Sequence, residues 1–260
     1  MRIAVCLSGQ LRNWKIGRDN QKWFWTTPNY EEVEVDYFAH TWDYSMDRVG
    51  VSQPYVEREI TQEEFKEFTE FFDTKKSKIE SLRTSDFYHN DHWSSLFYSF
   101  AQSVMMKREY ELENNFEYDL VIKSRPDVCF NPRHFCSLPS VINNNVLYTT
   151  HGGEMSMEFN MYNFNDCVFY GNSYTMDLLP NLYFYRQYGI HEDLGHGINI
   201  HPLGPGTLMH NYYRDNGITP IFKTGWSETL IKEGCPEGLN LFEEEEFDHM
   251  EHYFREWYNN

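Results

Sequence analysis

With 260 residues, of which 40% are hydrophobic and 18% aromatic, the chain can bury a substantial core, and this excludes an intrinsically disordered protein. A formal net charge of -18 excludes a protein that wraps nucleic acid, because the phosphates would be repelled, and it disfavours an anionic membrane surface. The five cysteines include no CxxC pair, so neither a disulfide framework nor a structural zinc site is expected.

The first apolar run, Ile3 to Leu7, is too short for the core of a signal peptide. No window approaches the ~20 apolar residues that a membrane-spanning helix needs. Most cysteines lie in apolar, strand-like runs, where they behave as small hydrophobic residues. The sequence therefore predicts a protein without a membrane span in the cytoplasm, or in the host cytoplasm if the protein is viral.

Apolar runs typical of buried strands alternate with helical patterns through the first half of the chain, as in α/β folds. Strands are expected at 3–7, 33–39, 78–82, 120–122, 146–150, 167–170 and 218–222. Helices are expected at 14–24, 61–72, 91–114, 173–185 and 207–216. Thr61 is expected to cap the second helix, with Glu64 completing a capping box. The pattern predicts one Rossmann-like α/β domain with a mostly parallel central sheet and helices on both faces.

Polar residues follow the first predicted strand directly, and ligands of open α/β sheets bind at the carboxyl ends of the strands. Ser8, Gly9 and Gln10 form this turn, and Arg12 comes two residues later. Gly9 allows close approach of a ligand to the backbone, and Arg12 is suited to a phosphate or a base edge. The alternative is an ordinary turn between a strand and a helix.

A second polar group follows the second predicted strand. It consists of His40, Thr41, Trp42 and Asp43. These residues are suited to stacking on a ring and binding a hydroxyl group, which makes His40, Thr41 and Asp43 candidates for nucleotide contacts. The alternative is a helix cap formed by Thr41 or Asp43, with Trp42 in the core.

A third group, Lys123 to Asp127, follows the strand around residues 120–122. Pro126 has no N–H to donate and is expected to end regular strand pairing there. Divalent cations such as Mg²⁺ and Mn²⁺ prefer carboxylate oxygens, which makes Asp127 the candidate metal ligand. Arg125 is suited to steadying a phosphate or to pairing with Asp127. The alternative is a structural Arg–Asp pair that closes the strand.

Three segments together resemble small glycosyltransferase-like proteins of the GT-A type from bacteria, large viruses and phages. They are CLSGQLR (Cys6 to Arg12), FAHTWD (Phe38 to Asp43) and YDLVIKSRPDV (Tyr118 to Val128). In GT-A enzymes a DxD motif ends a central strand and holds the metal of the sugar nucleotide. By resemblance, the RPD triplet 125–127 corresponds to that motif, and it departs from it because Arg125 replaces the first acid. The resemblance implies a Mn²⁺ or Mg²⁺ ion at Asp127.

The resemblance extends more loosely to about residue 222. It implies that Asp166 is the catalytic base or a carboxylate that positions the acceptor, with Asp193 as the second candidate. It also implies that His201 completes the metal site. The expected catalytic, nucleotide-sugar-binding domain covers 1–222, and 223–260 is an acidic extension that is part of the same domain or a lid.

The leading hypothesis is a metal-assisted glycosyltransferase that moves a sugar from a nucleoside diphosphate, UDP by family analogy, to the hydroxyl group of a saccharide or another acceptor. One alternative is a catalytically silent sugar- or nucleotide-binding module, which the missing first acid of the DxD motif favours. Another is a sugar nucleotidyltransferase, which would need a Gly-rich loop after the first strand. Gly9 and Arg12 match that requirement only in part.

Overall fold

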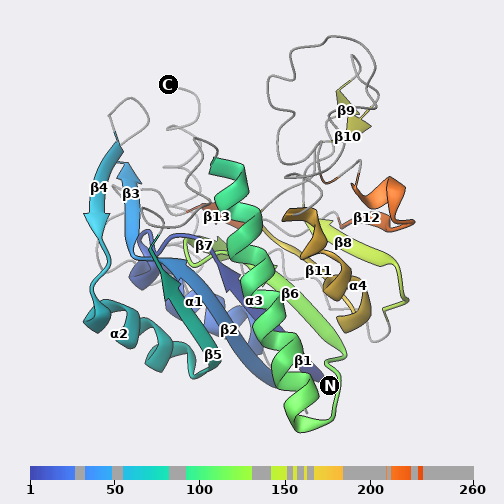
Figure 1. Cartoon of the computed structure of the whole chain (residues 1–260), viewed down its shortest axis with the longest axis horizontal. Coiled ribbons are helices and arrows are strands. Elements are labelled where there is room, and N and C mark those ends of the chain that lie inside the picture. The colour runs from blue at the N-terminus through green and yellow to red at the C-terminus, as the bar shows by residue number, and fades with distance from the viewer. Residues whose placement is uncertain are drawn as a thin grey trace, which may run out of the picture.

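The structure is a computed structural model that describes residues 1–26, 33–48, 55–81, 92–130, 142–150, 155–156, 161–162, 167–183, 209, 212–223 and 228–230. A seven-stranded sheet runs through the molecule in the order β12-β8-β11-β6-β1-β2-β5 (Figure 1). Its strands are β1 (Arg2–Ser8), β2 (Glu34–Trp42), β5 (Thr74–Glu80), β6 (Leu120–Ser124), β8 (Val146–Thr150), β11 (Phe169–Gly171) and β12 (Thr219–Lys223).

All strands of this sheet are parallel to their neighbours except β11, which is antiparallel to both β6 and β8. From β1 the chain first builds the sheet towards β2 and β5, and then returns to the other side of β1 to add β6. After β1 the chain therefore continues towards one side of the sheet, and after β6 it continues towards the other. The position between β1 and β6 is thus a topological switch point. Open α/β sheets bind their ligands in the crevice at such a point.

Helices cover both faces of the sheet, because β1 alternates between two apolar cores (Figure 1). Ile3, Val5 and Leu7 face the core under α1 (Trp14–Thr26) and α2 (Gln62–Phe72), whereas Ala4 and Cys6 face the core under α3 (His92–Asn114) and α4 (Ser173–Leu178). The predicted fold, a mostly parallel sheet with helices on both faces, is confirmed. None of the helices in the described ranges is long and apolar enough to cross a bilayer.

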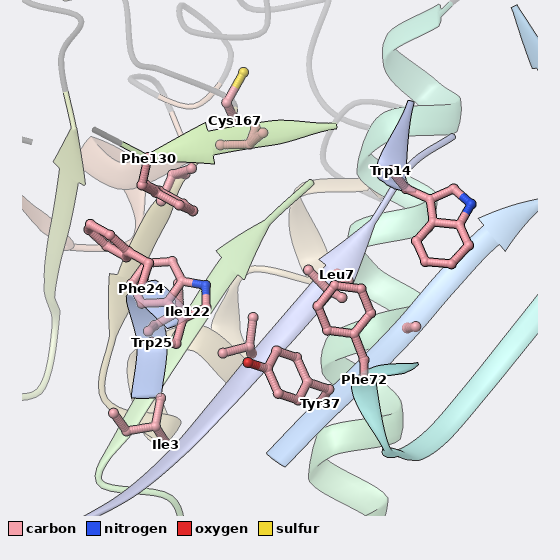
Figure 2. Packing of buried hydrophobic residues seen from close by; sticks show 14 of the residues in the cluster. Ile3, Leu7, Trp14, Phe24, Trp25, Tyr37, Phe72, Ile122, Phe130 and Cys167 are labelled. Atoms are coloured by element: carbon pink, nitrogen blue, oxygen red, sulfur yellow. The ribbon is translucent and has the colours of Figure 1, made fainter. Parts of the chain in front are cut away.

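Aromatic rings dominate the core on the α1 and α2 side (Figure 2). Phe24 of α1 stacks on Phe130 with ring centroids 4.3 Å apart, and Trp25 meets the same ring edge-on at 4.8 Å. Trp14 packs edge-on against Phe68 of α2 at 5.2 Å. These contacts fix α1 against the sheet. Because α1 begins directly after the turn that follows β1, they also hold the end of that turn in place.

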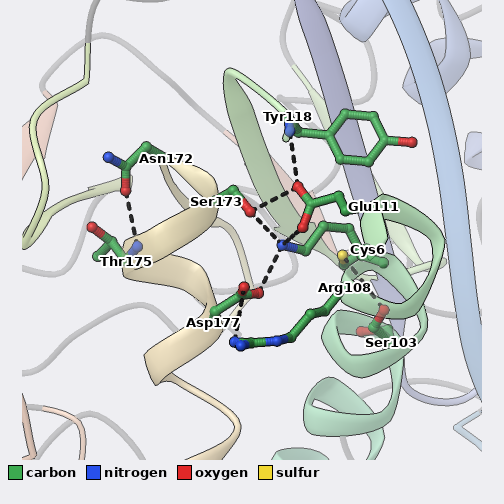
Figure 3. A network of polar contacts seen from close by, with 10 residues as sticks. Cys6, Ser103, Arg108, Glu111, Tyr118, Asn172, Ser173, Thr175 and Asp177 are labelled. Atoms are coloured by element: carbon green, nitrogen blue, oxygen red, sulfur yellow. Dashed lines mark hydrogen bonds and ion pairs between the residues drawn. The ribbon is translucent and has the colours of Figure 1, made fainter. Parts of the chain in front are cut away.

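A buried ion-pair cluster connects the two helices on the other face (Figure 3). Lys107 of α3 is fully buried, and its ammonium group donates to Glu111, Ser173 and Asp177 at 2.8, 2.6 and 2.7 Å. Glu111 also accepts from the backbone N–H of Tyr118, at the entrance to β6. We call Lys107, Glu111, Ser173 and Asp177 the lysine cluster. It ties α4 to α3 and α3 to the central strand.

Several predicted boundaries differ from the structure. Strand β2 continues through His40 to Trp42, and β5 begins at Thr74, because the two strands pair in parallel over this whole length. A hairpin of β3 (Tyr44–Arg48) and β4 (Tyr55–Glu59) follows β2 and was not predicted.

The helix predicted at 173–185 is also shorter in the structure. Asn172 caps it, but α4 ends at Leu178, since Pro180 lacks the N–H that would continue the helix, and residues 181–183 are helical again after this break. Tyr185 lies outside the described residues.

The predicted cap of α2 is correct, but the capping box is not. Thr61 accepts from the backbone N–H of Glu64 at 3.1 Å. The carboxylate of Glu64 instead accepts from Arg58 and from the indole N–H of Trp14. The side chain therefore ties the hairpin and α1 to α2 rather than closing the first turn of α2.

Four short strands, in two antiparallel pairs, complete the described part of the chain. β7 (Val128–Phe130) pairs antiparallel with β13 (Glu228–Leu230), and β9 (Met155–Ser156) pairs with β10 (Met161–Tyr162). The predicted acidic extension 223–260 thus contributes β13, which pairs with β7, the strand that follows β6 in the chain. Most of that segment lies outside the described residues, so its role as a lid or as part of the domain stays a prediction.

Candidate functional site

The turn after β1 is held from inside the molecule. Gly9 has a φ of 119°, a conformation that L residues rarely adopt, and a Cβ added there would meet no atom within 4 Å. Its N–H points inward, to the hydroxyl of Ser99 at 2.9 Å and the carbonyl of His40 at 3.2 Å. Gly9 therefore presents its open side, and not its amide, to the space beyond the sheet edge.

The next residues of this turn contact the hairpin. The side-chain oxygen of Gln10 accepts from the guanidinium of Arg12 at 2.8 Å and from the backbone N–H of Met46 in β3 at 2.9 Å. Ser8 is buried as the last residue of β1. Ser8, Gln10 and Arg12 were predicted to contact the ligand. In the structure, Gln10 and Arg12 are already bonded within the turn and to the hairpin, and Ser8 is buried.

At the end of β2, His40 is buried and uses both ring nitrogens within the protein. Nδ1 lies 2.9 Å from the hydroxyl of Ser99, and Nε2 lies 2.8 Å from a carboxylate oxygen of Glu80. Burial lowers the pKa of His40, and the hydrogen bond from His40 lowers the pKa of Glu80 to about 2. At neutral pH the ring is therefore neutral and donates from Nε2 to an ionised Glu80.

Two polar atoms at the same edge have no hydrogen-bond partner. The alternation of β2 places Thr41 on the face of α1 and α2, opposite Trp42, which stacks on Tyr98 of α3. The Thr41 hydroxyl and one carboxylate oxygen of the half-buried Asp43 are buried and unpaired. Such an atom costs about 1–3 kcal/mol, and most native proteins avoid it. The two atoms mark a place where hydrogen-bonding groups from a ligand would be favourable.

Beyond β6, Arg125 and Asp127 form a bidentate pair. The guanidinium donates from Nε and Nη2 to the two carboxylate oxygens, both at 2.8 Å. The amide of Gln21 in α1 donates to the carbonyls of Arg125 and Pro126 at 2.8 and 3.1 Å. This turn is therefore fixed from both sides, and the Arg–Asp pair that the sequence left as an alternative is present.

The described residues do not by themselves form a metal site. Each oxygen of Asp127 already accepts a hydrogen bond from Arg125, and no group of three His, Cys, Asp or Glu residues comes together within the described ranges. His201, the second predicted metal ligand, lies outside those ranges, as do the predicted catalytic residues Asp166 and Asp193. Their roles remain predictions.

The structure brings the three predicted segments to one edge of the sheet. Ser8 is the register partner of His40, and Leu7 is the partner of Ser124. Sequence reasoning missed Ser99, Glu80 and Gln21, which hold these segments in place from α3, β5 and α1. Ser99 lies 59 residues from His40 in the sequence and 90 from Gly9, so no local pattern points to it.

No protein-family model matches this chain, and no curated protein is similar to it. Among solved structures, a similar one is a glycosyltransferase involved in the glycosylation of the major capsid of PBCV-1. The two chains share 14% identity over 63% of this chain and 72% of the other, with a TM-score of 0.35. A likeness at this level assigns neither activity nor ligand.

Proposed function

We propose that the chain is a glycosyltransferase that binds a nucleoside diphosphate sugar, with a UDP-sugar favoured, at the edge formed by β1, β2 and β6. The observation that carries this proposal is the position of the unpaired Thr41 and Asp43 atoms. Thr41 lies on β2, the strand beside β1, and Asp43 directly follows β2, while the switch point of the sheet lies on the other side of β1. Beside them, Gly9 leaves open space at the same edge.

These two unpaired atoms are buried in the free protein, and a nucleoside that reached them would supply the hydrogen bonds that they lack. A ribose hydroxyl or a base N–H donates to the carboxylate of Asp43, and a ribose oxygen accepts from the hydroxyl of Thr41. Binding would then satisfy groups that the free protein leaves unpaired, so their cost becomes part of the binding free energy.

In this proposal the diphosphate binds to Arg125, the cation that follows β6. A guanidinium group is planar and always charged, which suits phosphate oxygens. Asp127 holds Arg125 in one orientation, and a preorganised positive charge stabilises the negative charge that develops on a leaving diphosphate. Because the described residues supply one carboxylate that is already paired, we assign no step to a Mn²⁺ or Mg²⁺ ion. The requirement for the ion is a matter of experiment.

In the proposed reaction, the acceptor hydroxyl oxygen bonds to the anomeric carbon, and the bond from that carbon to the diphosphate oxygen breaks. The acceptor is a saccharide or another hydroxyl compound. Asp166 is the proposed base that takes the acceptor's proton, and Asp193 is the second candidate.

The structure favours a glycosyltransferase over a sugar nucleotidyltransferase. A Gly-rich phosphate loop presents backbone N–H groups to the ligand, whereas the N–H of Gly9 is turned into the protein. A silent binding module remains the second candidate, because Arg125 neutralises the carboxylate that the GT-A resemblance assigns to the metal.

Thr41→Val tests the proposal, because valine keeps the shape and removes the unpaired hydroxyl. We expect the variant to melt at a higher temperature than the wild type, by removal of an unsatisfied group, and to bind UDP about 10-fold more weakly. Thr175→Val is the matched control. Thr175 is also fully buried, but its hydroxyl accepts from the N–H of Asn145 at 2.9 Å, so its loss should lower the melting temperature and leave UDP binding unchanged.

The assay is a thermal shift with UDP and a panel of UDP-sugars, with Mn²⁺ or with EDTA, followed by product analysis. Release of UDP supports a transferase, release of pyrophosphate supports a nucleotidyltransferase, and binding without turnover supports a silent module. If Thr41→Val and the wild type bind UDP equally well, the nucleoside does not sit at this edge.

A further inference from the structure

Ser99 of α3 lies at the meeting point of three elements under the site. Its side chain is fully buried. Its hydroxyl oxygen is 2.9 Å from the backbone nitrogen of Gly9, 2.9 Å from Nδ1 of His40 and 3.1 Å from the carbonyl of His40. One hydroxyl group therefore connects α3 to the turn after β1 and to the end of β2.

The protonation states fix the direction of each hydrogen bond. Glu80 is ionised and also accepts from the hydroxyl of Tyr98 at 3.0 Å, so it must accept from Nε2 of His40. A neutral ring with its proton on Nε2 has a lone pair on Nδ1, so the one proton of the Ser99 hydroxyl is shared between two acceptors of His40, Nδ1 at 2.9 Å and the backbone carbonyl at 3.1 Å. The oxygen of Ser99 then accepts from the N–H of Gly9. We call Glu80, His40, Ser99 and Gly9 the serine chain.

The turn at Gly9 needs such support. Glycine adopts a positive φ without steric strain, but it has the most backbone freedom to lose, and fixing one residue costs about 1–2 kcal/mol of conformational entropy. The N–H of Gly9 is held by two acceptors, and hydrogen bonds in a chain polarise one another. The serine chain therefore holds the turn in one conformation from below, while its upper side stays open.

We propose that Ser99 is a positioning residue of the nucleotide site, which keeps the Gly9 turn in the shape that the ligand meets. His40 and Glu80 orient its hydroxyl group. This inference rests on the proposed function, and it replaces the direct ligand contact predicted for His40 by an indirect role. None of the three side chains needs to touch the nucleotide.

The test compares Ser99→Ala with Ser103→Ala in the full-length protein. Ser103 lies one turn further along α3 and is also fully buried, but its hydroxyl donates to the carbonyl of Phe100 in the same helix, at 2.8 Å, and its side chain contacts the thiol of Cys6 in β1. The two readouts are hydrogen exchange of the Gly9 amide and the affinity for UDP. The loss of one hydrogen bond should speed the exchange of Gly9 about 10-fold and weaken UDP binding about 10-fold in Ser99→Ala, relative to Ser103→Ala.

The outcomes separate this inference from the proposed function. If the wild type binds UDP and Ser99→Ala binds it as tightly as Ser103→Ala, the inference is wrong and the proposed function stands. If the wild type binds no nucleotide although Ser99→Ala releases Gly9, the proposed function fails and Ser99 is only structural. If Ser99→Ala does not fold, the wild type decides: the Gly9 amide must exchange as slowly as the amides of β1, and fast exchange overturns the proposal.

Discussion

Helix α3 contributes to two buried polar clusters that differ in what surrounds them. Towards its end, the lysine cluster is closed, because each proton of the Lys107 ammonium group meets an acceptor. Near its start, Ser99 belongs to the serine chain, which ends at the edge of the sheet. The two unpaired atoms of Thr41 and Asp43 lie at that same edge.

The difference indicates where stability and function reside in this fold. A closed cluster with complementary charges connects secondary-structure elements and has nothing left to offer a ligand. A chain that fixes a turn beside buried, unpaired groups leaves hydrogen-bonding capacity unused, at some cost in stability. Proteins often accept such local costs at functional sites.

The largest effect is expected from Lys107→Met in the lysine cluster. The substitution leaves the buried carboxylate of Glu111 without its cation, whereas Asp177 keeps its pair with Arg108 at 3.2 Å, and breaking a buried pair in this way costs about 3–5 kcal/mol. Urea unfolding measures the loss. UDP affinity of the folded fraction should not change, because the cluster does not reach the site.

Lys66→Met is the matched control for this substitution. Lys66 and Glu70 have the same spacing in a helix as Lys107 and Glu111, at 3.6 Å, but their side chains are 73% and 67% exposed. An exposed pair contributes roughly 0–1 kcal/mol. Equal losses of unfolding free energy in Lys107→Met and Lys66→Met would show that the lysine cluster does not stabilise the fold more than an exposed pair does.

The second prediction concerns Asp127→Asn at the sheet edge. Asparagine keeps the shape but loses the charge that pairs with Arg125, whose side chain is 17% exposed. We expect a loss of about 1–3 kcal/mol in unfolding free energy and at least a 10-fold fall in sugar-nucleotide hydrolysis, because Arg125 is no longer held in place. The measurements are urea unfolding and hydrolysis against Mn²⁺ concentration.

The Mn²⁺ titration distinguishes the two roles of Asp127. If Mn²⁺ no longer stimulates the remaining activity, Asp127 is a metal ligand as the GT-A resemblance implies. If stimulation is unchanged, Asp127 only braces Arg125. Asp215→Asn is the control, since Arg214 and Asp215 form an exposed pair at 2.9 Å away from the sheet edge, and both measurements should stay at wild-type values. Wild-type activity and stability in Asp127→Asn would exclude both roles.

The sheet could be predicted because its strands are short, continuous apolar runs. β8 was predicted with the same bounds, and β1 and α3 within one residue at each end. Local patterns suffice for elements that are buried on both faces or that have a clear helical period. The hairpin of β3 and β4 carries no such signal, since polar and charged residues interrupt its few apolar ones and leave no continuous apolar run.

The contacts of the site were only partly predictable. The pairing of Arg125 with Asp127 is local, two residues apart, and the sequence already offered it as an alternative. The serine chain depends on the register of β2 with β5 and on how α3 packs over β1, which no local pattern encodes. The sequence therefore indicated which strand ends lie together, whereas the contacts of His40 with Ser99 and Glu80 became visible only in the structure, and its predicted contact with a ligand stays a prediction.

The two clusters should also respond to pH with opposite signs. Burial lowers the pKa of His40, so its contribution to stability is complete above its ordinary pKa of 6.5 and is lost as the pH falls through the lowered value. Glu80 faces the ring, and its own contribution to stability is lost as the pH falls from 4.5 to about 2. The loss of stability therefore continues at lower pH. Burial raises the pKa of Asp177, so its contribution is instead lost as the pH rises.

The smallest predicted effect is therefore a decrease in unfolding free energy between pH 8 and pH 5 that His40 causes. Lys78 and Glu80 are the charged groups that act on the ring, and Lys78 disfavours its protonation further. Imidazole ¹⁵N shifts should show a neutral ring protonated on Nε2 at pH 7, with a titration below pH 6.5. His40→Gln removes the titrating group, so its unfolding free energy in urea should vary less over this pH range than that of the wild type. An imidazole that titrates above pH 6.5, or that carries its proton on Nδ1 at pH 7, would contradict the direction of the serine chain and the support it gives to Gly9.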